Sequence, residues 1–142
     1  MNKRVLAIVQ DVRKRCEDFA FSRKAKDYPF YKEANLDCMC AVASFALHTA
    51  LRRNGFKSRV AYGFFDRDSN HCWVELNKYI IDITASQFEL KPIYITHKDN
   101  DLYAKKRSFI RYSRFFHNWG GQKPSSRISR SILSQNVLTP TE

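Results

Sequence analysis

The chain has 142 residues, enough for one domain with a hydrophobic core and too few for two. Hydrophobic residues make up 44% of it and aromatic residues 14%, which excludes an intrinsically disordered protein. The net charge is +11, and ten Lys/Arg against three Asp/Glu lie after residue 90. This basic last third could attract nucleic acid, an anionic membrane or an acidic protein, and a solvated surface explains it equally well.

The first predicted element is an amphipathic helix over about residues 3–22. Its apolar positions recur at helical spacing, and charged side chains fill the opposite face. The apolar run is interrupted by Asp11 and is too short for a signal peptide or a membrane span. We therefore expect a cytoplasmic protein without a membrane span. Its four cysteines are then expected to be free thiols, metal ligands or a nucleophile rather than disulfides.

A second helix is predicted in the stretch CAVASFALHTALRRNG, residues 40–55, after a polar loop that contains Pro29. This stretch is apolar on most faces, which indicates a buried helix. Asp37 lies just before it, where an N-cap belongs, and Gly55 lies at its end, where a C-cap belongs.

The middle of the chain predicts a small antiparallel sheet. Residues 58–65 are rich in strand formers, and residues 71–76 and 79–84 predict a hairpin around an Asn-Lys connection. A further strand is expected over residues 92–96. The combination of helices and strands predicts an α+β fold.

The last part of the chain gives weaker signals. Residues 102–119 are aromatic and basic, and their pattern fits a helix and a strand equally well. From residue 120 the run GGQKPSSRISRSILSQ is typical of a flexible segment. We therefore expect one folded domain, residues 1–119, and a flexible basic tail, residues 120–142.

The hairpin predicts a pair of side chains able to move a proton. In its expected register Leu76 lies opposite Tyr79. Trp73 then faces Asp82, and His71 lies diagonally across on the same face. The backbones of His71 and Asp82 are about 7 Å apart in this register, within reach of a side-chain hydrogen bond. A carboxylate that holds one imidazole nitrogen leaves the other free to act as a base.

Cys40 is the candidate nucleophile for this pair. It opens the predicted buried helix, where unpaired backbone N–H groups and the helix dipole favour a thiolate. Cys40, His71 and Asp82 together predict a catalytic acyl-transfer site. In such a site the cysteine attacks, the histidine moves the proton and the aspartate orients the imidazole.

The order of these motifs resembles that of the transglutaminase-like (papain-like) cysteine enzymes. In that family a cysteine opens a helix that ends in a glycine, and the next strand carries an arginine and a second glycine. The matching residues here are Cys40, Gly55, Arg59 and Gly63. The segment HCWVELNKYIIDIT resembles the family's His-x-Trp-Val-Glu and Asp-x-Thr strands. The likeness covers about residues 35–90, and the ending Asp-x-Thr-Ala-x-Gln-Phe is similar in layout to bacterial lasso-peptide leader peptidases.

The resemblance implies a papain-like fold, in which the helix bearing Cys40 packs on a small antiparallel sheet. It also implies a peptidase that cleaves a peptide amide of a peptide or protein substrate through Cys40, His71 and Asp82. A protein-glutamine deamidase or a transglutaminase would use the same acyl-enzyme and is the alternative.

Two supporting roles and one rival nucleophile are further hypotheses. Asn35 is the candidate oxyanion donor. Trp73 either shields the histidine–aspartate pair from water or is plain core packing. Cys38, two residues before Cys40, is the rival nucleophile.

A zinc site is the competing interpretation of the cysteines. Its four ligands would be Cys38, Cys40, His71 and Cys72. Neighbours on a strand point to opposite faces, so His71 and Cys72 should not easily bind one ion. We therefore expect Cys72 to pack in the core, and we predict no metal and no cofactor.

The stretch KKRSFIRYSRFFHNW suggests a function of a different class. Arginine and aromatic side chains are interleaved in it, and such a segment could stack on bases and hold phosphates. Inward packing of its aromatic residues explains the same pattern. The second hypothesis is therefore a non-catalytic module that binds nucleic acid or another anionic partner through the basic last third.

Overall fold

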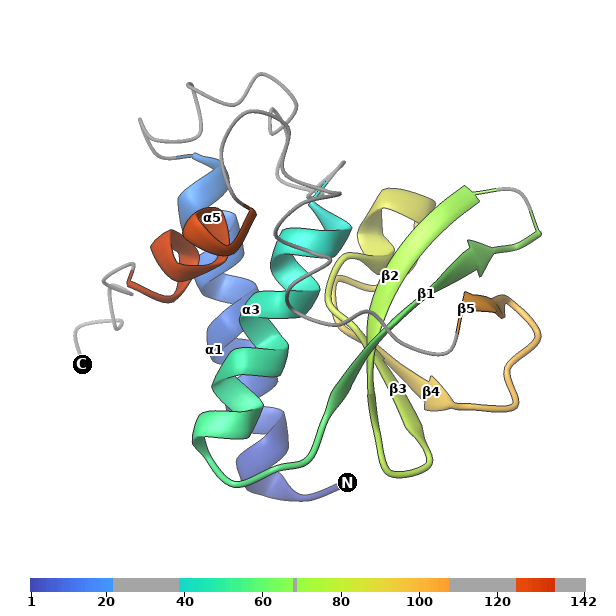
Figure 1. The fold of residues 1–142 in the computed structure, drawn as a ribbon, viewed down its shortest axis with the longest axis horizontal. Helices are drawn as coiled ribbons and strands as arrows, with labels where there is room; N and C mark the ends of the chain where they lie inside the picture. Colours follow the sequence, from blue (N-terminus) through green and yellow to red (C-terminus); the bar gives the residue numbers. More distant parts are fainter. Residues whose placement is uncertain (22–38, 68, 108–124, 135–142) are drawn as a thin grey trace.

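A five-stranded antiparallel sheet and three α-helices make up the part of the chain described by this computed structural model, residues 1–21, 39–67, 69–107 and 125–134 (Figure 1). The helices are α1 (Lys3–Ala20), α3 (Cys40–Arg53) and α5 (Ser125–Leu133), with a short 3-10 helix η1 (Ala85–Phe88). The strands are β1 (Arg59–Phe65), β2 (Ser69–Leu76), β3 (Tyr79–Asp82), β4 (Tyr94–His97) and β5 (Tyr103–Arg107). Their order in the sheet is β4-β3-β2-β1-β5. The predicted α+β class is confirmed.

The hairpin of β2 and β3 has the register that the sequence predicts, with Leu76 opposite Tyr79. Asn77 in the connection has a φ of 54°, a left-handed conformation that asparagine adopts more readily than most residues. Strand β3 ends at Asp82, two residues earlier than predicted. The Asp82 carboxylate accepts a hydrogen bond of 2.9 Å from the backbone N–H of Thr84, and this local bond replaces the strand pairing.

Helix α3 forms the middle layer of the fold, between the sheet on one side and α1 and α5 on the other (Figure 1). Its side chains from 41 to 47 are all buried, which confirms the predicted buried helix. Such a helix suits a middle layer because it has an apolar face for each neighbour.

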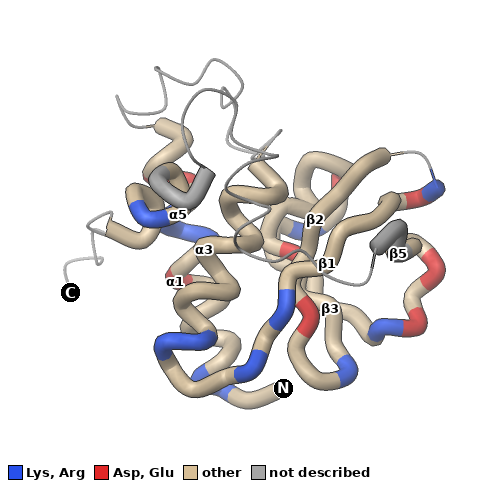
Figure 2. Tube along the Cα trace, in the orientation of Figure 1, with Lys and Arg blue, Asp and Glu red and all other residues tan. Residues whose placement is uncertain are grey.

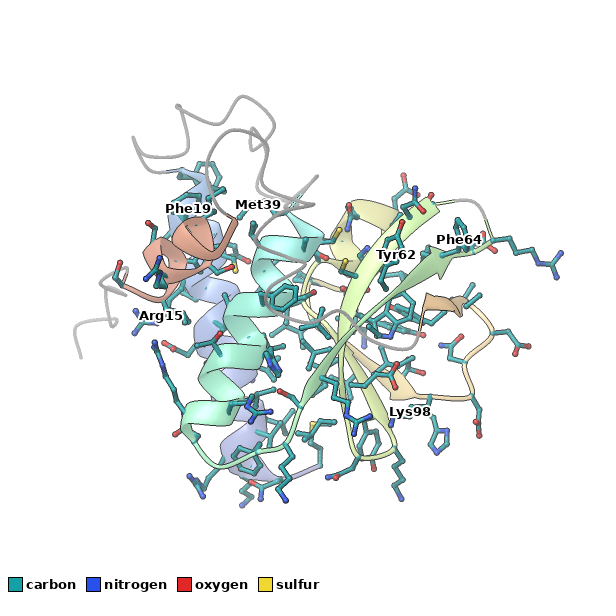
Figure 3. All side chains as sticks on the ribbon, viewed as in Figure 1. Arg15, Phe19, Met39, Tyr62, Phe64 and Lys98 are labelled. Atoms are coloured by element: carbon teal, nitrogen blue, oxygen red, sulfur yellow. The ribbon has the colours of Figure 1, made fainter. Side chains whose placement is uncertain are left out.

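The two ends of α3 are formed differently. Met39 holds the N-cap position without a side-chain hydrogen bond, and Asp37, expected there, lies outside the described residues. Met39 is fully buried, and Figure 3 shows it near Phe19, at the same end of the helical layer. Gly55 ends the helix as predicted, with a φ of 87° and its N–H bonded to the Arg52 carbonyl at 3.0 Å.

The two faces of the sheet have different partners. One face packs on α3 through Cys72, Val74 and Leu76, as part of the main core. The other face carries a second apolar cluster, formed by Ala61, Phe65, Trp73, Ile80 and Tyr103. Because alternate residues of a strand point to opposite faces, His71 lies on the face of this second cluster.

Helix α5 lies in the stretch where the sequence predicts a flexible tail. Ile128 and Ile132 are only 2% and 0% exposed, and α5 packs on α1 and α3. The hydroxyl of Ser129 donates to the Val42 carbonyl of α3 at 2.8 Å. The expectation of a flexible tail is therefore wrong for Ser125–Leu133, because the apolar residues four apart in a polar run form one face of a helix.

The remaining boundaries differ by one or two residues. Strand β2 begins at Ser69, and β4 covers Tyr94–His97 rather than 92–96. The undecided stretch begins as a strand, β5, and its residues 108–119 lie outside the described part of the chain. None of the helices described is long and apolar enough to cross a membrane.

Candidate active site

Three elements bring the predicted catalytic residues together. Cys40 is the first residue of α3, His71 lies in β2, and Asp82 ends β3. The His71 Nε2 atom lies 2.7 Å from the Asp82 Oδ2 atom, and both side chains are fully buried. The predicted histidine–aspartate hydrogen bond is therefore present, between residues eleven positions apart in the chain.

The Asp82 carboxylate is fixed by further donors. Its Oδ2 atom also accepts a bond of 2.8 Å from the Tyr103 hydroxyl. Its Oδ1 atom accepts bonds from the Thr84 backbone N–H at 2.9 Å and the Thr84 hydroxyl at 3.3 Å. A buried carboxylate with four donors holds one orientation, and it holds the imidazole of His71 in one orientation as well.

His71 lies in an aromatic environment. Its ring centroid is 4.8 Å from that of Phe88, 6.0 Å from that of Trp73 and 6.2 Å from that of Phe65. Burial here opposes the charged form, but the charge and hydrogen bond of Asp82, together with Cys40, outweigh burial and raise the pKa of His71 to about 9. This shift favours the protonated imidazole near neutral pH.

Cys40 is the partly exposed cysteine of the site, whereas Cys16 and Cys72 are buried. A hydrogen bond from the Cys72 side chain lowers the pKa of Cys40 well below its ordinary value, despite burial, and a bond and charge from His71 add to this. In turn, the bond to Cys40 and burial raise the pKa of the Cys72 thiol. Both shifts favour a thiolate at Cys40 and an imidazolium at His71, with Cys72 as a donor to the thiolate.

The contact of Cys40 with both His71 and Cys72 differs from the sequence expectation. Neighbouring side chains of β2 do point to opposite faces, but β3 pairs with β2 only from Val74 to Leu76. The edge of β2 at His71 and Cys72 therefore has no β3 partner, and the Cys40 sulfur also accepts from the Cys72 backbone N–H. A sulfur at the edge of a strand can contact side chains of both faces.

The described residues contain no group of three His, Cys, Asp or Glu side chains arranged to hold a metal ion. Cys38, one of the four ligands considered for zinc and the rival nucleophile, lies outside the described residues. So does Asn35, the candidate oxyanion donor. The basic aromatic segment after Arg107, proposed for an anionic partner, lies outside them as well.

Trp73 lies directly against the site. It is fully buried, and its indole N–H donates to the Glu75 Oε2 atom at 3.2 Å. Its ring also contacts that of Tyr103, with centroids 5.0 Å apart. Trp73 therefore both packs the second cluster and covers one side of the His71 imidazole.

Sequence reasoning missed Gln87 and Tyr103 as members of the site. The Gln87 Nε2 atom lies 3.3 Å from the His71 Nδ1 atom and 3.3 Å from the Thr84 hydroxyl. Gln87 stands in the motif Asp-x-Thr-Ala-x-Gln-Phe, and its position five residues after Asp82 was the available signal. Tyr103 lies in the stretch whose pattern fitted helix and strand equally, so no signal pointed to it.

Arg13 connects α1 to the segment that follows Asp82. Its side chain is buried, and Nη1 donates to the Ile83 carbonyl at 2.7 Å and to the Ser86 hydroxyl at 3.0 Å. These bonds join α1 to the chain between β3 and η1, which connects Asp82 to Gln87.

We expect Arg13→Met to lower the free energy of unfolding by about 2 kcal/mol, because the methionine keeps the packed stem but leaves a buried carbonyl without its charged donor. Lys14→Met is the matched control, since Lys14 is half-exposed and its ion pair with Asp18 lies at the surface. That control should stay within about 0.5 kcal/mol of the wild type. Urea denaturation measures both, and equal effects of the two substitutions would show that the Ile83 contact contributes nothing.

Comparison with models of known protein families, with curated protein sequences and with solved structures finds no match for this chain.

Proposed function

We propose that this protein is a cysteine-nucleophile acyl-transfer enzyme of the transglutaminase-like (papain-like) type, and that it cleaves peptide amides. The observation that carries the proposal is the 2.7 Å bond between His71 and Asp82, with Cys40 hydrogen-bonded to the same imidazole at the start of a buried helix. A low-pKa cysteine beside a charged histidine is the arrangement that nucleophilic catalysis needs. The antiparallel sheet packed on the helix bearing Cys40 supports the likeness to that fold.

In the proposed reaction the Cys40 thiolate attacks the carbonyl carbon of the amide and forms a tetrahedral oxyanion. The His71 Nδ1 proton then passes to the leaving nitrogen, the C–N bond breaks and a thioester remains on Cys40. Neutral His71 next takes a proton from water, whose oxygen attacks the thioester, and the acid product leaves while Cys40 returns to the thiolate. Asp82 holds the Nε2 side of the ring throughout, so that Nδ1 faces the reacting atoms.

Backbone N–H groups of the first turn of α3 and the Gln87 amide are the groups proposed to stabilise the oxyanion. The first N–H groups of a helix have no partner within it. The Gln87 amide lies beside the His71 Nδ1 atom, on the side where the substrate carbonyl would sit. Preorganised donors at this place act on the charge that develops during attack.

We expect Gln87→Ala to slow peptide cleavage by about 10- to 100-fold, because one oxyanion donor is lost. The alkylation rate of Cys40 near pH 6 should change less than about threefold, since the groups that lower its thiol pKa are untouched. Steady-state kinetics and thiol alkylation measure the two rates. A parallel fall in both would mean that Gln87 acts by positioning His71 instead.

Incubation with a peptide library, followed by mass spectrometry, tests the proposed function. New peptide termini that the Cys40→Ala variant does not produce, and that Cys16→Ala still produces, would support a peptidase. Conversion of glutamine to glutamate, or amine attachment at glutamine, with the same dependence on Cys40 would favour the deamidase or transglutaminase alternative. Products that persist in Cys40→Ala, or no product of any kind, would contradict the proposal.

A further inference from the structure

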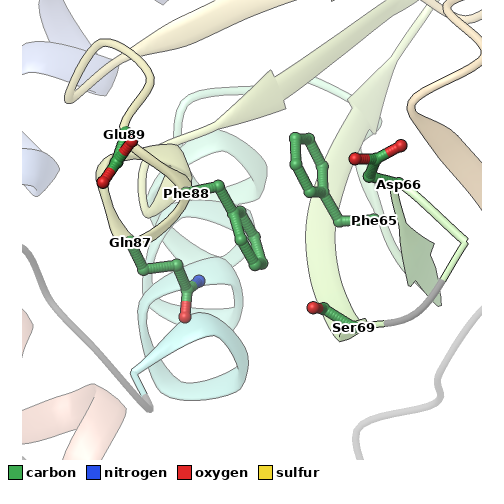
Figure 4. A pocket seen from close by; sticks show the side chains of 6 residues that line it. All are labelled: Phe65, Asp66, Ser69, Gln87, Phe88 and Glu89. Atoms are coloured by element: carbon green, nitrogen blue, oxygen red, sulfur yellow. The ribbon is translucent and has the colours of Figure 1, made fainter.

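A pocket of about 340 Å³ lies beside the candidate active site, on the side of η1. It is lined by Phe65, Asp66, Ser69, Gln87, Phe88 and Glu89 (Figure 4). Three of these residues also contact His71: the ring centroids of Phe88 and Phe65 lie 4.8 Å and 6.2 Å from that of His71, and the Gln87 Nε2 atom lies 3.3 Å from its Nδ1 atom. A group bound in this pocket would therefore lie next to the bond under attack.

The wall of the pocket is aromatic. The rings of Phe65 and Phe88 stack with centroids 4.2 Å apart and planes 12° apart. Ser69 and Gln87 add a hydroxyl and an amide to its lining (Figure 4). A volume near the lower end of the range for ligand pockets, about 300–1,000 Å³, suits one long side chain rather than a large cofactor.

The charge of the pocket opposes that of the protein. Among the described residues, its lining includes the exposed carboxylates of Asp66 and Glu89 and no lysine or arginine. Yet the whole chain holds 25 Lys/Arg against 14 Asp/Glu. Figure 2 shows basic and acidic residues interspersed along the chain, with both kinds side by side in the loops at the outer end of the sheet.

Backbone structure sets the position of both carboxylates. Asp66 has a φ of 47° and Glu89 a φ of 64°, left-handed conformations that are uncommon for residues other than glycine, although aspartate adopts them more readily than glutamate. The Asp66 N–H donates to the Leu102 carbonyl at 2.8 Å, and the Glu89 N–H donates to the Ser86 carbonyl at 3.1 Å. Figure 4 shows the two carboxylates on opposite sides of the phenylalanine pair.

We propose that this pocket binds the side chain of a lysine or arginine of the peptide substrate, next to the amide that Cys40 attacks. The inference rests on the proposed function and adds a substrate class to it, basic peptides. The methylene stem of such a side chain packs along the stacked rings, and the cationic end reaches the carboxylate of Asp66 or Glu89. The face of an aromatic ring also attracts the cation directly.

Binding of two short peptides to the full-length Cys40→Ala variant tests this inference. The peptides are acetyl-Ala-Ala-Lys-Ala-Ala-amide and the same peptide with norleucine in place of lysine, so that only the charge differs. In NMR titrations the lysine peptide should bind about tenfold more tightly and shift the amide signals of Gln87 and Phe88. The net charge of +11 repels the lysine peptide, so overall electrostatics cannot produce this preference.

The double substitution Asp66→Asn and Glu89→Gln should bring the two affinities within about twofold of each other, because it removes the charge and keeps the shape. Asp101→Asn, at an exposed site outside the pocket lining, is the control and should keep the preference. Equal binding of the two peptides, binding of neither, or a preference that survives the double substitution would overturn the inference. Because the nucleophile is absent, these results do not depend on cleavage, whereas failure of the proposed function shows only in the cleavage assay.

Discussion

Asp82→Asn should remove the reactivity of the site, slowing acyl transfer by about 10²- to 10⁴-fold. An asparagine that keeps its carbonyl toward Thr84 points its amide at the His71 Nε2 atom, which must then accept a hydrogen bond. The proton of neutral His71 moves to Nδ1, and the ring no longer serves as a base toward Cys40. Burial then opposes the charged form with only Cys40 to offset it, so the pKa of His71 should fall well below about 9. NMR titration of the imidazole measures this pKa.

The same substitution should lower the free energy of unfolding by about 2–4 kcal/mol, because donors at the buried carboxylate lose their charged acceptor. The loss should depend on pH. The pKa of His71 is raised in the folded state by its pairing with Asp82. The stabilisation that comes from this pairing is therefore fully present below pH 6.5, and it is lost as the pH rises through about 9 and His71 loses its proton. The difference in stability between wild type and Asp82→Asn should therefore shrink between pH 6.5 and 9.5.

A surface pair in the same chain provides the control for Asp82→Asn. The His97 Nδ1 atom lies 3.1 Å from the Asp99 Oδ2 atom, with the Asp99 side chain 89% exposed. Asp99→Asn should change stability by less than about 0.5 kcal/mol. If Asp82→Asn has as small an effect, or if the pKa of His71 stays near 9, Asp82 does not hold the imidazole in the way described.

Trp73→Ala should lower the free energy of unfolding by about 3–5 kcal/mol, because it empties the middle of the second cluster. Trp73→Phe distinguishes the contribution of the aromatic ring from that of the indole N–H. It keeps an aromatic ring against His71 but removes the bond to Glu75, and it should cost about 1–2 kcal/mol. Urea denaturation followed by circular dichroism measures both changes.

The role of Trp73 beside the site is tested with the same variants. Trp73→Phe should leave the alkylation rate of Cys40 unchanged, because His71 stays covered. Phe21→Ala, at an aromatic side chain that is 73% exposed, is the packing control and should change stability by less than about 0.5 kcal/mol. A loss below about 1 kcal/mol in Trp73→Ala would contradict the assignment of Trp73 to a packed core.

The sequence predicted those parts of the site that depend on local pattern. The apolar run from Cys40 predicted a buried helix, and the alternation on either side of Asn77 predicted the register that puts His71 and Asp82 on one face. Such patterns have short periods that are visible within a dozen residues. The His71–Asp82 hydrogen bond therefore followed from the sequence without knowledge of the rest of the fold.

The missing parts depend on contacts between distant segments. Tyr103 reaches Asp82 across 21 positions of the chain, and Arg13 reaches Ile83 across 70, with no periodic pattern that connects them. The contact of Cys72 with Cys40 depends on where β3 ends, and element ends are the least predictable feature of a sequence. Helix α5 was not predicted because the glycine, proline and serine residues around it are typical of a flexible segment. That signal was given more weight than the helical spacing of Ile128 and Ile132.

The most direct test of the central claim is the alkylation rate of each cysteine near pH 6 by a limiting thiol reagent, mapped by mass spectrometry, in wild type and in His71→Ala. A thiolate–imidazolium pair predicts that Cys40 reacts at least about tenfold faster than Cys16, Cys38 and Cys72, and that His71→Ala abolishes this lead. If Cys40 reacts no faster than the others, or if its lead survives without His71, the pair does not exist and the proposed acyl-transfer function has no nucleophile.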